Sequence, residues 1–137
     1  MSTKRFVLAT LAGGIAVFIL GGLIYGVLTV GFFEANQGSA VGVMRATPDY
    51  VHLFLGQLVF GALLTVIIGK WAGQSDAGAG LRIGAVFGAL FGFAMDLTMF
   101  GVTNIQNITA TLVDPLFAMI QMGIGGAVVG AVLGKVR

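Results

Sequence analysis

Four long stretches with very few charged residues constrain this chain more than any other feature. They run approximately over residues 6–33, 50–69, 81–102 and 112–134. A helix needs about 20 apolar residues to cross the hydrocarbon core of a bilayer, where every backbone amide must be satisfied internally. The sequence therefore predicts an all-α, polytopic membrane protein with four transmembrane helices in a single domain, residues 1–137.

Charge and residue types exclude several other classes of protein. Charged residues make up 9% of the chain, whereas a soluble domain carries about 25%. The net charge of +2 is no signature of nucleic-acid binding, and we expect no nucleic-acid partner. The chain has no cysteine and only one histidine, so thiolate sites and multi-histidine sites are excluded. We expect no metal site and no cofactor.

Basic residues predict the orientation of the helices. One side of the predicted bundle carries six of them: Lys4, Arg5, Lys70, Arg82, Lys135 and Arg137. The other side carries only Arg45. Cytoplasmic segments are enriched in Lys and Arg, so we expect both termini in the cytoplasm and connectors 34–49 and 103–111 outside. The first stretch is too long for the apolar region of a signal peptide, and we expect an uncleaved helix.

Glycines recur at every fourth position in the predicted helices. The third stretch has Gly80, Gly84, Gly88 and Gly92, and the fourth has Gly126, Gly130 and Gly134. Small residues at this spacing allow helix backbones to approach closely in lipid. The sequence therefore predicts a glycine-rich bundle of the glycine-zipper kind.

A shift of 65 residues superimposes the second stretch on the fourth. It places Asp49 on Asp114, Gly61 on Gly126 and Lys70 on Lys135. Two interpretations stay open, an internal duplication and the basic anchor common to helices that end in the cytoplasm.

Polar residues within the predicted helices gather toward the outer side. At about 1.5 Å per residue, Asp96 lies roughly 22 Å from the cytoplasmic start of its helix, and Gln57 and Gln121 lie about 10 Å below the outer boundary. A carboxylate inside a span indicates function by default. The candidate binding residues are Asp96, Gln57, Gln121, His52, Asn104 and Asp114. We expect them to form a polar pocket open to the outside.

Several of these polar residues also have a purely structural interpretation. Asp114 followed by Pro115 fits the N-cap and first helical position of the fourth stretch, and Asp49 fits the N-cap of the second stretch. Tyr25 fits an aromatic anchor at the membrane interface. Methionines in the outer half, such as Met95 and Met99, with the single imidazole, are an alternative Cu(I) set, although methionine usually fills gaps in membrane helices.

The chain resembles a family of small bacterial four-helix integral membrane proteins classed as a domain of unknown function. The resemblance lies in the segment Gly21 to Gly26 and in the segments 83–104 and 130–134, chiefly in their glycines and aromatic residues. In related sequences a tryptophan often precedes the tyrosine, where this chain has Ile24. The resemblance implies a bacterial inner-membrane location, and it implies no catalytic residues.

These observations favour a non-catalytic accessory, scaffold or binding subunit with an outward-facing polar pocket. We expect its partners to be the lipid bilayer and either further copies of the chain or a larger membrane complex. One alternative is a small transporter or proton-coupled carrier that uses Asp96. A further alternative is a membrane-embedded enzyme acting on lipid, with Asp96 or Asp114 as acid or base and His52 as its partner.

Overall fold

The computed structural model describes residues 1–137 and confirms the predicted all-α class. Four helices are long and apolar enough to cross a membrane: Thr3–Leu28, Tyr50–Trp71, Ala77–Val102 and Ile108–Lys135. In order along the chain, the elements are α1 (Thr3–Leu23), the π-helix η1 (Ile24–Leu28), α2 (Val30–Ala35), α3 (Tyr50–Thr65), the π-helix η2 (Val66–Trp71), α4 (Ala77–Val102) and α5 (Ile108–Lys135).

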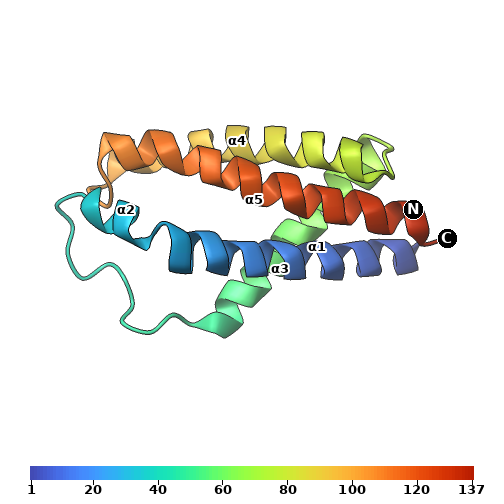
Figure 1. The fold of residues 1–137 in the computed structure, drawn as a ribbon, viewed down its shortest axis with the longest axis horizontal. Helices are drawn as coiled ribbons and strands as arrows, with labels where there is room; N and C mark the ends of the chain where they lie inside the picture. Colours follow the sequence, from blue (N-terminus) through green and yellow to red (C-terminus); the bar gives the residue numbers. More distant parts are fainter.

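The helices form an elongated bundle with two distinct ends (Figure 1). α4 and α5 lie side by side, α1 runs along α5, and α3 crosses α1 obliquely. Both chain termini lie at one end, here called the terminal end. The short α2 and the turn at 103–107 lie at the other, here called the turn end.

Polar side chains cap the starts of the four long helices. Ser2 accepts a hydrogen bond from the amide of Arg5, Asp49 from that of His52, Asp76 from that of Ala79, and Asn107 from that of Ala110. Such caps satisfy amides that have no partner within the helix. They confirm the prediction for Asp49.

The start of α5 corrects the prediction for Asp114 and Pro115. Because Asn107 caps the helix, α5 begins at Ile108 rather than near residue 112, and Pro115 lies inside it. Asp114 is therefore no N-cap. The two aspartates related by the 65-residue shift thus occupy different places, Asp49 at a helix start and Asp114 within a helix.

The first long helix ends earlier than its apolar sequence predicts. The amide and the hydroxyl of Thr29 both donate to the carbonyl oxygen of Ile24, at 2.9 and 2.6 Å. The wide turn they close ends the span at Leu28, where the sequence predicted continuation to Phe33. The chain then changes direction into α2 (Figure 1).

The two connectors at the turn end bond to each other. Gln37 and Gln106 form an isolated antiparallel bridge. The amide of Gly38 donates to the carbonyl of Ile105, and that of Ala40 to the carbonyl of Asn104, each at 2.9 Å. The connectors 34–49 and 103–111, predicted to share one side of the membrane, therefore lie at the same end of the bundle.

α4 and α5 approach each other through their backbones. A side-chain carbon added at Gly80 would overlap the carbonyl oxygen of Gly126, and one added at Gly126 would overlap that of Gly80. α1 and α3 cross in the same way, since a carbon added at Gly61 would overlap the carbonyl of Thr10 and lie 2.9 Å from the Cα atom of Gly14. Only glycine allows this spacing, because any Cβ would displace the neighbouring helix.

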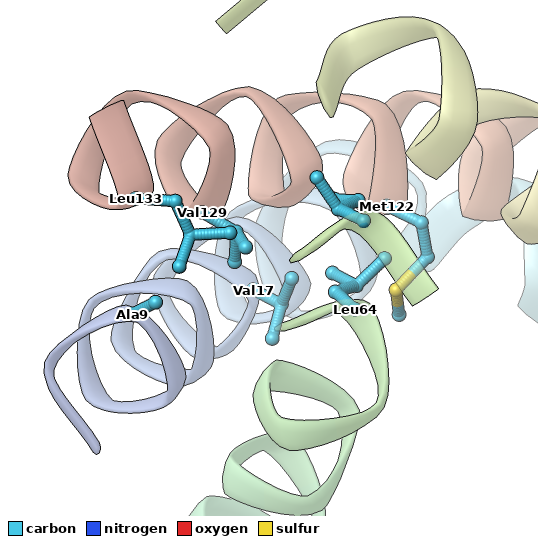
Figure 2. Packing of buried hydrophobic residues seen from close by; sticks show 7 residues of the cluster. Ala9, Val17, Leu64, Met122, Val129 and Leu133 are labelled. Atoms are coloured by element: carbon cyan, nitrogen blue, oxygen red, sulfur yellow. The ribbon is translucent and has the colours of Figure 1, made fainter. Parts of the chain in front are cut away.

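The apolar core lies where α1, α3 and α5 meet (Figure 2). Val17, Leu64 and Val129 are fully buried there, one from each helix. The core includes Ala9 and Leu133, which lie toward the terminal end of α1 and α5. This apolar cluster lies nearer the terminal end than Asp96 and Asp114 do.

Candidate functional site

The register of α4 against α5 brings two aspartates together. Along α4, Gly92 packs against Pro115 of α5, since an added carbon would lie 3.0 Å from the proline Cα. One helical turn further along α4 is Asp96, and its polar neighbour on α5 is Asp114. Each aspartate lies six residues from the end of its helix at the 103–107 turn. The hairpin therefore places both carboxyl groups at the same level.

The two carboxyl groups share one partly buried site with the hydroxyl of Tyr25. Asp114, on α5, is the neighbour of both other groups: the Asp96 carboxyl on α4 and the Tyr25 hydroxyl on η1. Two carboxyl oxygens, Asp96 Oδ2 and Asp114 Oδ1, are buried and accept no hydrogen bond. The only carboxylate that lies within ion-pair distance of a basic side chain is Asp49, beside His52. No basic side chain therefore neutralises the pair of Asp96 and Asp114.

Aromatic rings lie beside the carboxyl pair. The ring of Tyr25 is 5.7 Å from that of Phe33, and the rings of Phe32 and Phe33 lie 6.1 and 6.0 Å from that of Phe117. Phe117 follows Asp114 by three residues and so lies on the same side of α5. The faces of aromatic rings attract cations. We call Tyr25, Asp96 and Asp114 the carboxyl site.

Tyr25 owes its position to the π-helix η1. A π-turn inserts an extra residue into a helix and is frequent at functional sites. The sequence predicted an interfacial anchor, but the side chain lies against Asp114 inside the bundle. No motif in the sequence indicates this contact. The common level of Asp96 and Asp114, by contrast, follows from counting residues outward from the 103–107 turn once α5 is known to begin at Ile108.

Gln57 and Gln121 meet in a second polar contact, which ties three helices together. The Gln121 side-chain amide donates to the carbonyl of Val17 at 2.8 Å and to Oε1 of Gln57 at 3.4 Å. Gln121 is buried, and Gly21 leaves the room that it occupies, since an added carbon there would lie 2.8 Å from its Nε2. The donors of Gln121 are used within the protein, in contrast to the unpartnered oxygens of the carboxyl site.

His52 and Asn104 make other contacts. The Nδ1 atom of His52 lies 2.6 Å from Oδ2 of Asp49, and both side chains are exposed to solvent to a substantial degree. The hydrogen bond from the backbone amide of His52 holds the pKa of Asp49 below its usual value, and the bond to the His52 side chain adds a smaller effect in the same direction. Asn104 is exposed and bonds through its backbone carbonyl. The structure therefore does not place His52 as an acid–base partner of the carboxyl site.

The chain brings no three His, Cys, Asp or Glu side chains together in a group suited to a metal ion. Asp96 Oδ2 and Asp114 Oδ1 are the only buried side-chain oxygen atoms that have no hydrogen-bond partner, and the Tyr25 hydroxyl lies beside Asp114. The chemistry of the carboxyl site suits a positively charged guest held by oxygen, such as a shared proton or a small cation.

No family model, curated protein or solved structure matches the chain. The resemblance to the four-helix bacterial family stays a prediction.

Proposed function

We propose that this chain is a multi-pass protein of a bacterial inner membrane and acts as a non-catalytic binding subunit. The four apolar helices support the membrane location. Six basic residues lie toward the terminal end: Lys4, Arg5, Lys70, Arg82, Lys135 and Arg137. Arg45 lies in the connector at the turn end. By the positive-inside rule the terminal end faces the cytoplasm and the carboxyl site faces outward.

The carboxyl site is the proposed binding site, and its ligand is a cation. Two ionised carboxylates are acceptors only, so they cannot hydrogen-bond to each other. Like charges at short range, away from water, are also unfavourable. The pair therefore needs a positive charge between its oxygens, either a shared proton or a bound cation. This pairing of Asp96 with Asp114, without a basic neighbour, is the observation that carries the proposal.

The apolar core supports binding rather than transport. Transport across the full width of a membrane needs polar groups along the path. Between the carboxyl site and the terminal end, the bundle contains fully buried apolar side chains, among them Val17, Leu64 and Ile68. The hydroxyl of Thr65 at this level donates to the carbonyl of Gly61 in its own helix. Access to the site is therefore proposed from the turn end.

The proposal includes attachment to further helices, either copies of this chain or other subunits. Gly22, Gly26 and Gly56 lie on long helices, and a carbon added at any of them would meet nothing within 4 Å. Such small residues on an outer surface allow another helix to pack closely in lipid. Chemical crosslinking in native membranes tests this part of the proposal.

The binding role is tested by titrating the purified full chain with sodium and with tetramethylammonium. Calorimetry reports binding, and the infrared carbonyl band of protonated carboxyl groups reports the shared proton. We expect the added cation to bind and to remove this band in the native chain and in Glu34→Gln, whose side chain is exposed. Asp96→Asn and Asp114→Asn should lack both effects.

Stability distinguishes a binding site from a purely structural contact. Asparagine at position 96 donates a hydrogen bond to the Asp114 carboxylate, so Asp96→Asn should fold at least as stably as the native chain while losing the cation. A loss of stability, with cation binding retained, would contradict the proposal. Cation flux into liposomes that depends on Asp96 would instead identify the chain as a carrier.

A further inference from the structure

A cavity opens at the terminal end between the start of α1 and the π-helix η2. Its volume is about 440 Å³, and it is lined by Met1, Ser2, Thr3, Phe6, Val66 and Lys70. It lies at the opposite end of the bundle from the carboxyl site.

The lining of this cavity is amphipathic. Its polar part consists of the Lys70 ammonium group and the hydroxyl groups of Ser2 and Thr3, and its apolar part consists mainly of Phe6 and Val66. No carboxylate lines it, and Lys70 forms no ion pair within the chain. Its side chain is exposed. The cavity therefore offers the uncompensated positive charge of Lys70 beside an apolar wall.

The hydroxyl groups complement this charge. The oxygen of Ser2 accepts a hydrogen bond from the Arg5 amide at 3.3 Å, which leaves its O–H free to donate. The hydroxyl of Thr3 takes part in no side-chain hydrogen bond. A phosphate group accepts hydrogen bonds from hydroxyl and ammonium donors, and bonds to a charged group are the stronger kind. The polar part of the cavity thus matches the phosphate of an ester.

The position of the cavity indicates how such a ligand is presented. Lys70 precedes Trp71, whose side chain is 71% exposed, and neighbouring Trp and Lys residues are typical of the headgroup level of a membrane. The Met1 side chain packs against Gly69, because a carbon added at Gly69 would lie 3.2 Å from Met1 Sδ. Phe6 and Val66 lie about one helical turn further from the terminal end than Thr3 and Lys70 do.

We propose that the cavity binds an anionic phospholipid, with its phosphate at Lys70, Ser2 and Thr3 and the start of an acyl chain along Phe6 and Val66. A soluble phosphate shares the headgroup chemistry but leaves the apolar wall in contact with water. The apolar wall therefore favours the lipid as the source of the phosphate. The inference depends on the membrane location and is independent of the carboxyl site.

The experiment titrates the detergent-solubilised full chain with phosphatidylglycerol and, separately, with phosphatidylcholine. Native mass spectrometry counts the lipids that stay bound. The variant Lys70→Gln removes the charge in the cavity, and Lys135→Gln removes one at the same end outside the lining. Thr3→Val removes a hydroxyl at nearly constant shape and provides a second variant if Lys70→Gln fails to fold.

We expect phosphatidylglycerol to bind more tightly than phosphatidylcholine. Lys70→Gln should weaken its binding roughly tenfold, the change that corresponds to a charged hydrogen bond of about 1.4 kcal/mol. Thr3→Val should weaken it severalfold, and Lys135→Gln should leave it unchanged. Inorganic phosphate should not displace the lipid.

Three outcomes would overturn the proposal. One is equal binding of the two lipids. Another is an equal loss of phosphatidylglycerol binding in Lys70→Gln and Lys135→Gln, because binding would then depend only on the total charge of the terminal end. The third is displacement of the lipid by inorganic phosphate, which would assign the cavity to a soluble ligand.

Discussion

The contact between α4 and α5 makes a sharp prediction about one methyl group. Gly84→Ala adds a carbon that would overlap the carbonyl oxygen of Met122 and lie 3.1 Å from the Cα atom of Gly126. These neighbours are backbone atoms, so no side-chain rotation relieves the contact and the helices must separate. Gly56→Ala is the matched control, since a carbon added there meets nothing within 4 Å.

The magnitude follows from two opposing effects. Alanine is favoured over glycine in a helix interior by about 1 kcal/mol, and this gain applies to both variants. Overpacking a tight contact costs typically about 1–3 kcal/mol. Separation at Gly84 also loosens the neighbouring contact between Gly80 and Gly126, so we take the upper part of that range, about 2–3 kcal/mol. The free energy of unfolding of Gly84→Ala should therefore be about 2–3 kcal/mol lower than that of Gly56→Ala.

Unfolding in mixed micelles of increasing sodium dodecyl sulfate content, followed by circular dichroism, measures both variants. We expect Gly56→Ala to be slightly more stable than the native chain and Gly84→Ala to be clearly less stable. Equal stability of the two variants would refute the close backbone contact of α4 with α5.

Three further predictions concern polar side chains. Gln121→Leu removes the donor to α1 and α3 and should lower the free energy of unfolding by about 1–2 kcal/mol; unchanged thermal unfolding would mean that these bonds do not matter. Asn107→Ala removes the cap of α5 and should cost about 1 kcal/mol in the same assay, whereas Asn104→Ala, at an exposed side chain, should stay within about 0.5 kcal/mol of the native chain. Because bonds from His52 lower the pKa of Asp49, the capping stabilisation is present above the usual carboxyl pKa and is lost as pH falls through the lowered value. Solution NMR should show α3 fraying at its first turn in acid, and a variant Asp49→Asn that frays with the same pH profile would contradict this assignment.

Local sequence is sufficient for much of the fold. An apolar run of about 20 residues predicts a helix wherever it lies, because its backbone must bond internally in lipid. The cap at Asp49 is predictable from local sequence, because the side chain and the amide it binds are only three residues apart. The cap at Asn107 competes with a second cap-like pair at Asp114 and Pro115, and the local pattern alone favoured the wrong one.

The carboxyl site depended on the tertiary structure. The sequence singled out Asp96 because a carboxylate is costly in a span, but its partner belongs to another helix and was interpreted as a cap. Tyr25 joins the pair through a π-turn that the apolar sequence of the first helix does not reveal. The distance between Asp96 and Asp114 depends on how closely α4 and α5 pack at their glycines. Whether the two side chains face each other depends on how each helix is rotated about its own axis. Sequence periodicity gives the face of a helix, whereas the neighbour that the face meets is decided only by packing.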